Sequence, residues 1–434
     1  MKKRRTEPES YVSFTEEMRQ EYTVLMPMML SRHFRLIRQV LLNYGYKAEL
    51  LENMGPEIAE TGLKYVHNDT CYPAILVIGQ FISALQSGKY DPHKTALIYF
   101  QTGGGCRASN YISLLRKALR HAGYGYVPVI SMNFSGLENH PGFKMTLPLL
   151  HRLFYAIVYG DMLLTLVHQC KPYEINPGES ERLAEELTGQ LADGMMSEGV
   201  SFKKVKRNCK MMLERFGAIS RRNEKRIRVG VVGEIYVKYS PLGNNNLEQF
   251  LNDEGAEVVM PGLLDFFLYS LIATMSDWKL YGLKAAGYPL ARLAFGFVTR
   301  QQNEIIEMMK EDGRFEPATP ITHTISLIRD YMGLGTKMGE GWLLPAEMLE
   351  LNDKGVHNII CTQPFGCLPN HICGKGMMKP LRDRNPEMNI VAIDYDAGAT
   401  RVNQENRIKL MLANAREKLE EEKQNREETN PACV

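Results

Sequence analysis

The sequence predicts an α/β protein with two parallel-sheet domains and a helical region between them. Three observations support this fold class. Predicted strands and helices alternate from residue 22 to residue 133, helical periodicity alone fills residues 148–222, and the alternation returns after Arg226. Such alternation is typical of a parallel sheet that carries helices on both faces.

The elements of the first domain follow from hydrophobic runs that end at turn residues. Gly45, for example, ends an amphipathic helix that connects the first two strands. The sequence predicts strands at 22–29, 47–51, 95–100 and 127–132, and helices at 31–44, 74–86 and about 109–121.

The second half of the chain begins with helices, in which Pro172 and Pro177 are the strong breaks. From Arg226 the pattern predicts a strand, a glycine- and asparagine-rich loop, a helix and another strand. Gly230 and Gly233 lack the third glycine of a dinucleotide-binding fingerprint. Residues 355–376 are predicted to form a strand that runs into a turn with three cysteines, and residues 389–398 a further strand. Residues 403–424 are predicted to form a charged helix, and the last ten residues are expected to be disordered.

These patterns divide the chain into four segments. We predict a first α/β domain at 1–147 with the Cys71 and Cys106 loops, a helical region at 148–225, a second α/β domain at 226–412 with the Cys367 loop, and a charged C-terminal helix and tail at 413–434.

Composition limits the classes of function. A chain of 434 residues with 44% hydrophobic and 24% charged residues is able to bury a large core. Its net charge of +2 gives no electrostatic reason to expect a nucleic-acid partner. There is no uncharged apolar run of about 18 residues, and "MKKRRTEPES" at the N-terminus lacks the apolar segment of a signal peptide. We therefore expect a cytoplasmic protein with no membrane partner.

The eight cysteines are the most informative residues. In a large chain of a reducing compartment they do not indicate a disulfide framework, which leaves metal binding or inert burial. Cys170 and Cys209 lie in helical patterns and Cys433 in the tail. Five others are assigned to turns rich in glycine, proline or asparagine, which favours metal binding: Cys71, Cys106, Cys361, Cys367 and Cys373.

The stretch "FQTGGGCRASNY" at 100–111 shows why a metal is favoured. Its cysteine follows three glycines at the carboxyl end of a predicted strand, where α/β folds bind ligands. The glycines let the backbone approach a bulky group, and the stretch lacks the Lys-Ser/Thr ending of a phosphate-binding loop. We assign Cys71 and Cys106 to strand-to-helix loops of one sheet. Because Cys71, Cys106 and Cys367 all adjoin predicted strand ends or helix starts, two facing domains could bring them into one cleft.

Three thiolates in a cleft suit an iron-sulfur cluster. Zinc is the rival metal, but closed zinc sites usually contain a C-x2-C pair, whereas Cys361, Cys367 and Cys373 have C-x5-C spacing. The remaining alternative is that the cysteines are buried apolar residues.

The motifs "NDTCYPA", "QTGGGCRASNY", "GEIYVKYSPLGNNNLEQFL", "QPFGCLPNHICGKG", "DYDAG" and "NQENRIKLML" resemble those of the 2-hydroxyacyl-CoA dehydratase superfamily. The chain is most similar to the dehydratase-like part of the activase-related proteins and to the adjoining double-cubane cluster proteins, over about residues 22–412. The resemblance implies two flavodoxin-like (Rossmann-like) domains, cysteine loops that meet in a cleft, a homodimer, and an oxygen-sensitive iron-sulfur cluster that a separate ATP-hydrolysing activator reduces.

The resemblance also implies the ligands. Cys71, Cys106 and Cys367 match best, as in a dehydratase subunit that holds one 4Fe-4S cluster on three cysteines and leaves one iron open. A double-cubane 8Fe-9S cluster takes six cysteines. Cys361 and Cys373 would add two of these, and the sixth would be Cys170 or Cys209.

Several polar residues are candidates for catalysis or for hydrogen bonds to the cluster. They lie at a predicted helix start or in loops near the same sheet edge, where they are also suited to plain helix capping or surface turns. These candidates are Arg107, Ser109, Asn110, Asn133, Asn370 and His371.

Three functions follow as hypotheses. The first is an iron-sulfur redox enzyme that reduces a small substrate after ATP-driven activation. The second is a 2-hydroxyacyl-CoA dehydratase component that performs radical dehydration, which requires a CoA pocket and a second subunit. The third is an electron carrier or cluster-bearing scaffold without a substrate cavity. The sequence contains no clear CoA signature, which favours the first.

Overall fold

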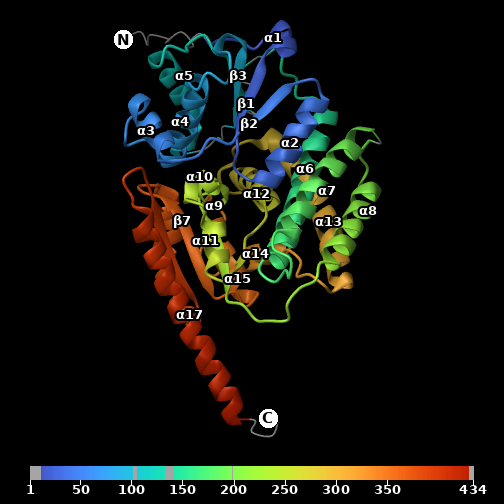
Figure 1. The fold of residues 1–434 in the computed structure, drawn as a ribbon, viewed down its shortest axis with the longest axis vertical. Coiled ribbons are helices and arrows are strands. Elements are labelled where there is room, and N and C mark those ends of the chain that lie inside the picture. The colour runs from blue at the N-terminus through green and yellow to red at the C-terminus, as the bar shows by residue number, and fades with distance from the viewer. Residues whose placement is uncertain (1–10, 101–104, 133–137, 139, 198, 430–434) are drawn as a thin grey trace. The chain divides into compact units, whose positions relative to one another are not determined.

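The computed structural model describes residues 11–100, 105–132, 138, 140–197 and 199–429. The chain forms two compact units, Met1–Leu153 and Phe154–Val434, which we call unit 1 and unit 2. Each contains a sheet of four parallel strands with helices packed around it (Figure 1). The predicted α/β class and the two parallel sheets are thereby confirmed.

Unit 1 has the strand order β2-β1-β3-β4. Strands β2 (Lys47–Leu51) and β3 (Thr95–Phe100) coincide with the predicted ranges, whereas β1 (Thr23–Pro27) and β4 (Val129–Met132) are shorter than expected. Strands β1, β3 and β4 consist mainly of buried apolar residues covered by helices, whereas the edge strand β2 is buried only at Ala48 and Leu51. The helices are α1 (Glu16–Glu21), α2 (Ser31–Asn43), α3 (Pro56–Tyr65), α4 (Tyr72–Gln86) and α5 (Tyr111–His121).

Unit 2 begins with the predicted helical region and continues with a sheet of the order β6-β5-β7-β8. Helix α6 (Leu147–Cys170) starts in unit 1, and α7 (Glu179–Ser197) and α8 (Phe202–Gly217) follow it. The strands are β5 (Arg228–Gly233), β6 (Glu257–Val259), β7 (Asn358–Pro364) and β8 (Asn389–Tyr395).

The other helices of unit 2 lie between and after these strands. Numbered by sequence, both sheets share the order second-first-third-fourth strand. The helices are α9 (Ile235–Tyr239), α10 (Pro241–Asn244), α11 (Leu247–Asp253), α12 (Leu263–Tyr281), α13 (Tyr288–Asp312), α14 (Ile321–Ile328), α15 (Leu343–Asp353), α16 (Met378–Arg384) and α17 (Arg401–Thr429).

The structure corrects the predicted loop after β5, which forms the two short helices α9 and α10. Glu234 and Ser240 cap them by accepting hydrogen bonds from Val237 N and Gly243 N. Asn245 and Asn246 then adopt the left-handed conformation, with φ of 56° and 60°, and end the helical stretch. The asparagine-rich segment is therefore helical because side-chain caps satisfy backbone N–H groups at the two helix starts.

Two further expectations about the C-terminal half were wrong. Helix α17 runs to Thr429 rather than ending at 424, because its last turns consist of residues with high helix propensity; residues 430–434 lie outside the described part of the chain. Cys361 lies in the middle of β7 and not in a turn. It is aligned with Val232 of β5 and Ala392 of β8, because the Ile359-Ile360 run continues as a central strand.

Gly230 has a packing role in the second sheet. A Cβ atom at this position would lie 2.5 Å from Cδ1 of Leu351 on α15. The glycine therefore permits close packing of a helix on β5, which accounts for it without a dinucleotide.

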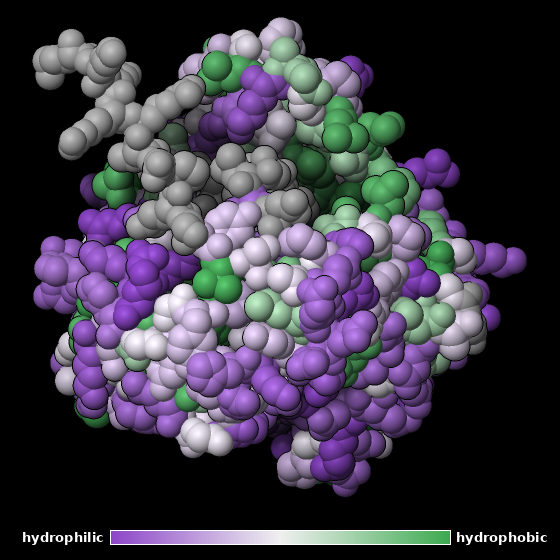
Figure 2. Space-filling view, turned by 90° about the horizontal axis from the view of Figure 1, so that it is seen from above, coloured by the Kyte–Doolittle hydropathy of each residue, from purple (hydrophilic) through white to green (hydrophobic). Residues whose placement is uncertain are grey.

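Helix α6 is long and apolar enough to cross a membrane, but 61% of its most apolar window is buried inside the protein. Core helices of soluble proteins have the same property. Figure 2 shows a face on which hydrophilic residues cover wide areas and hydrophobic residues form smaller groups. These features fit a soluble α/β protein.

Candidate functional site

Cys71 and Cys106 occupy neighbouring loops of unit 1. Cys71 is the N-cap residue of α4, and Cys106 is the N-cap residue of a single 3-10 turn, Arg107–Asn110, that leads into α5. The Arg107 guanidinium donates a hydrogen bond to the carbonyl oxygen of Asp69 and so joins the two loops. Both cysteines are partly exposed.

The position of Cys71 differs from the prediction, which assigned it to a strand-to-helix loop. Helix α3 intervenes, so Cys71 follows a helix. Helix α4 nevertheless leads back to the start of β3, which places its own N-terminus toward the carboxyl edge of the sheet. Gly79 fixes this geometry, since a Cβ there would lie 2.0 Å from the carbonyl oxygen of Ile58 on α3.

Cys367 occupies the corresponding loop of unit 2, after its third strand. Nδ2 of Asn370 lies 3.4 Å from the sulfur of Cys367 and 3.3 Å from Oε2 of Glu340, and it donates toward both. Asn370 is fully buried, and its Oδ1 has no hydrogen-bond partner among the described residues. The amide therefore aims a donor at the candidate ligand sulfur.

Two buried carboxyl groups, those of Glu340 and Glu234, lie close to this loop. Glu340 accepts from Ile235 N at 3.1 Å, and Glu234 caps the same short helix through Val237 N at 2.8 Å. Burial, together with the nearby Glu340 charge, raises the pKa of Glu234 to about 8. Burial likewise raises the pKa of Glu340. Both groups therefore hold protons more tightly than an exposed glutamate does.

Neither of these two acids is among the site residues predicted from the sequence. The available signal was Glu234 itself, which directly follows the apolar run "VGVVG" and thus stands at the carboxyl end of a strand. Glu340 has no such signal, because it lies in the segment between α14 and α15, far from β5 in sequence.

The short helix that Glu234 caps also contributes one partner of a buried ion pair. Nζ of Lys238 is 3.0 Å from Oε1 of Glu347, and both side chains are almost fully buried. A buried pair of this kind lowers the cost of each charge, but it leaves a large penalty if one partner is removed.

The Cys367 loop also exposes large apolar side chains to solvent. Phe365 and Leu368 are each 67% exposed and Ile372 is 56% exposed. Apolar residues gathered on a surface loop are typical of a region that contacts a partner or a ligand.

The other cysteines of unit 2 are more deeply buried. Burial raises the pKa of Cys361 to about 12 and also raises that of Cys373, which lies in the single π-helical turn Asn370–Gly374. Cys170 and Cys209 lie in α6 and α8 as predicted, and burial raises the pKa of each to about 12. Burial also raises the pKa of the candidate ligand Cys367 to about 12. All of these thiols, that of Cys367 included, are therefore suited to remain protonated in the absence of a metal.

The candidate polar residues mainly organise the cysteine loops. Oγ of Ser109 donates to the carbonyl oxygen of Cys106 at 2.8 Å, and Asn110 is the N-cap residue of α5 without a side-chain capping bond. His371 Nδ1 is 3.0 Å from the carbonyl oxygen of Cys367. Asn133 lies outside the described residues.

Within the part of the chain that the structure describes, no group of three or more His, Cys, Asp or Glu side chains is arranged to hold a metal ion. Cys71 and Cys106 belong to unit 1 and the other three candidate ligands to unit 2. A comparison with protein-family models and with curated proteins finds no match for this chain. The iron-sulfur cluster and the superfamily therefore stay predictions.

Proposed function

We propose that this chain is the cluster-bearing component of an iron-sulfur redox enzyme of the 2-hydroxyacyl-CoA dehydratase-like superfamily. It would reduce a small substrate after an ATP-hydrolysing activator has reduced its cluster. The proposal includes a homodimer, as the resemblance implies, and a location in the cytoplasm, as the sequence composition predicts.

The observation that carries this proposal is a repeated cysteine position. Both sheets share one strand order, which is that of the first four strands of a flavodoxin-like fold. Each has a cysteine after its third strand, Cys106 after β3 and Cys367 after β7. Ligands of open α/β sheets bind at this carboxyl edge. The Arg107 bond to the Asp69 carbonyl adds Cys71 to the same region of unit 1.

The local chemistry of these residues suits an iron-sulfur cluster. Cys71 precedes a long helix, whose N-terminal amides favour a thiolate. The Asn370 amide donates toward the Cys367 sulfur, and hydrogen bonds to sulfur tune the potential of a cluster. When bound, the cluster would supply one-electron reduction of a substrate.

The residues around Cys367 would contribute positioning and exclusion of water. Glu340 holds the Asn370 amide in place, and Asn370 in turn orients the ligand sulfur. The exposed side chains of Phe365, Leu368 and Ile372 would cover a cluster with apolar surface once a substrate or partner closes over the loop.

We favour a single 4Fe-4S cluster on Cys71, Cys106 and Cys367. Cys361 is fully buried in a central strand, and its sulfur would lie only 3.1 Å from a Cβ atom placed on Gly374. The sixth ligand of a double cubane would have to be Cys170 or Cys209, which are also fully buried. A double cubane would therefore require larger rearrangements of unit 2.

The deciding experiment is iron and acid-labile sulfide analysis of anaerobically purified protein. About four of each per chain would support the single cluster, while about eight irons with nine sulfides would replace it with the double cubane. Air should bleach the visible absorption. A colourless protein without iron, even after anaerobic reconstitution with iron and sulfide, would refute the proposal.

A further inference from the structure

Unit 2 contains a cavity that is separate from the cysteine loops. It has a volume of about 110 Å³ and is lined by residues of α6, α12, α13, the end of β6 and α15. Because an apolar cavity of about 150 Å³ binds benzene, this one suits a ligand slightly smaller than benzene. Much of its wall is apolar, with Val158 and Met162 from α6 and Val298, Ile305, Ile306 and Met309 from α13.

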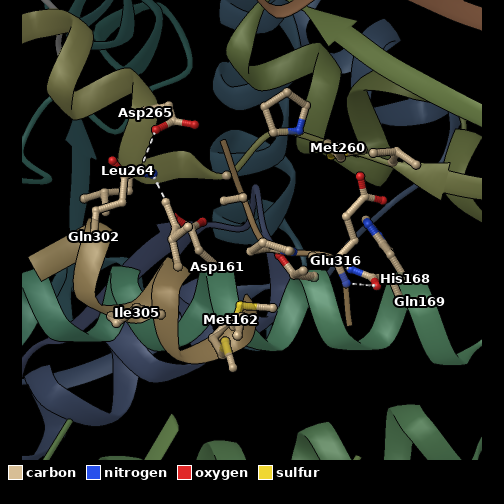
Figure 3. A pocket seen from close by; sticks show the side chains of 18 of the residues that line it. Asp161, Met162, His168, Gln169, Met260, Leu264, Asp265, Gln302, Ile305 and Glu316 are labelled. Carbon is tan, nitrogen blue, oxygen red and sulfur yellow. Dashed lines mark hydrogen bonds between the residues drawn. The ribbon is translucent and has the colours of Figure 1, made fainter. Parts of the chain in front are cut away.

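One end of the cavity is built from hydrogen-bond acceptors. Gln302 donates from Nε2 to Oδ1 of Asp265 at 2.9 Å, as Figure 3 shows. This bond fixes the orientation of the amide, since a flipped amide would place its oxygen against the carboxylate oxygen. Gln302 Oε1 has no hydrogen-bond partner among the described residues, and the side chain is only 8% exposed.

Two buried carboxyl groups line this cavity. Asp265 is 5% exposed and Glu350 is 6% exposed. Among the described residues Asp265 has no cationic partner, whereas the nearby Lys354 charge favours the ionised form of Glu350. Glu350 accepts a hydrogen bond from Oγ1 of Thr324 at 2.9 Å. Burial, together with the nearby Glu350 charge, raises the pKa of Asp265.

The nearby cations are occupied elsewhere. Lys238 pairs with Glu347. Lys354 donates to the carbonyl oxygen of Pro317. Arg228 pairs with Glu316 at the opposite end of the cavity. Among the described residues, the Gln302 amide oxygen therefore lacks a donor and the Asp265 carboxyl group lacks a cation.

We propose that this cavity binds a small primary ammonium ion with a short apolar chain. Its ammonium group would donate to Gln302 Oε1 and pair with Asp265. Its chain would contact the apolar wall that includes Met162 and Ile305. A metal ion fits less well, because the described residues do not arrange three His, Cys, Asp or Glu side chains around a common point. This inference does not depend on the iron-sulfur function.

The test is isothermal titration of the full-length protein with n-butylammonium, with n-butyrate and n-butanol as probes of the same chain length. We expect saturable binding of n-butylammonium alone. Equal or absent binding of all three would overturn the proposal, because the acceptor end of the cavity would then recognise no cation.

Variants locate the site. Gln302→Leu should weaken n-butylammonium binding by about tenfold, because it removes the acceptor. Asp265→Asn, which keeps an acceptor for Gln302 Nε2, should weaken binding at least as much. The matched control is Asn303→Leu, an exposed position on the same helix. Both cavity variants should keep the iron content of wild type within error, so a failed iron assay and a failed titration are separable. Unchanged affinity in Asp265→Asn would exclude this site.

Discussion

Unit 1 and unit 2 arrange their four parallel strands in the same order, and each has a cysteine after its third strand. Their carboxyl groups, however, are stabilised in opposite ways. In unit 1, Glu138 is paired with both Arg116 and His140. In unit 2, Glu234 and Glu340 are both buried, and burial together with the Glu340 charge raises the pKa of Glu234. The comparison indicates that the sheet edge of unit 2 keeps buried acids at a cost in stability, as functional sites often do.

The largest expected effect concerns the cysteines, which should be equivalent in the two units. Cys106→Ala and Cys367→Ala should each abolish iron binding, because each removes one of three ligands of the proposed cluster. Iron analysis after anaerobic reconstitution measures this. Cys361→Ala is the comparison variant and should retain iron, whereas its loss would favour the double cubane. If Cys106→Ala kept its full iron content while Cys367→Ala lost it, the proposed equivalence of the units would be wrong.

The buried ion pair of unit 2 should show the largest effect on stability. Lys238→Met leaves the Glu347 carboxylate buried without its ammonium partner and should lower the free energy of unfolding by about 3–5 kcal/mol. Urea unfolding followed by tryptophan fluorescence reports on this unit, since Trp278 and Trp342 both lie in it. The double variant Lys238→Met/Glu347→Leu should recover most of the loss. A cost below about 1 kcal/mol for the single variant would show that the pair is solvated.

The paired carboxyl group of unit 1 should make stability fall in acid. Burial opposes ionisation of Glu138, but hydrogen bonds from His140 and Arg116 outweigh it and lower the pKa to about 2. Because this pKa lies below the ordinary value of 4.5, the ionised group contributes stability above pH 4.5 that is lost as the pH falls toward 2. Glu138→Gln should therefore cost about 3 kcal/mol at pH 7 and almost nothing near pH 2.

Hydrogen exchange of amides in α5 and β4 measures this cost within unit 1. The exposed Glu57→Gln on α3 is the matched control and should leave exchange unchanged. A cost for Glu138→Gln that is the same at both pH values would argue against the ion pair.

The fold was largely predictable because local signals agreed with the tertiary structure. The β3 run Thr95–Phe100 is apolar and bounded by turn residues, and the structure has the same limits. The α9–α10 segment was predicted as a loop because its caps, Glu234 and Ser240, act through side-chain bonds that composition does not reveal. Local patterns therefore predict elements better than they predict caps.

The candidate site was predictable only in part, since it combines distant residues. Cys106 and Cys367 stand out because glycine and proline surround them at strand ends. Glu340, by contrast, reaches the Cys367 loop through Asn370, a contact that exists in the folded chain alone. Cys361 was wrongly assigned to a turn because it was grouped with Cys367 and Cys373, the cysteines that follow it in turns.

The smallest expected effect concerns Glu234, and it should have the opposite dependence on pH from that of Glu138. Its pKa in the folded protein is raised to about 8, so the protonated group contributes stability below pH 4.5 that is lost as the pH rises through 8. Glu234→Gln stays neutral and keeps an acceptor for Val237 N. It should therefore match wild type near pH 4.5 and exceed its stability above pH 8.

The gain should be only about 1 kcal/mol, because a neutral amide oxygen accepts a weaker hydrogen bond from Val237 N than a carboxylate does. Urea unfolding followed by tryptophan fluorescence at pH 5 and pH 9 measures it, with the exposed Glu307→Gln on α13 as control. A gain in stability that appears only at the higher pH would show that Glu234 in unit 2 keeps its proton in the folded protein, whereas Glu138 in unit 1 is ionised. If the stability of Glu234→Gln and of wild type instead changed in parallel with pH, the pKa of Glu234 would not be raised. The predicted difference between Glu234 and Glu138 would then be wrong.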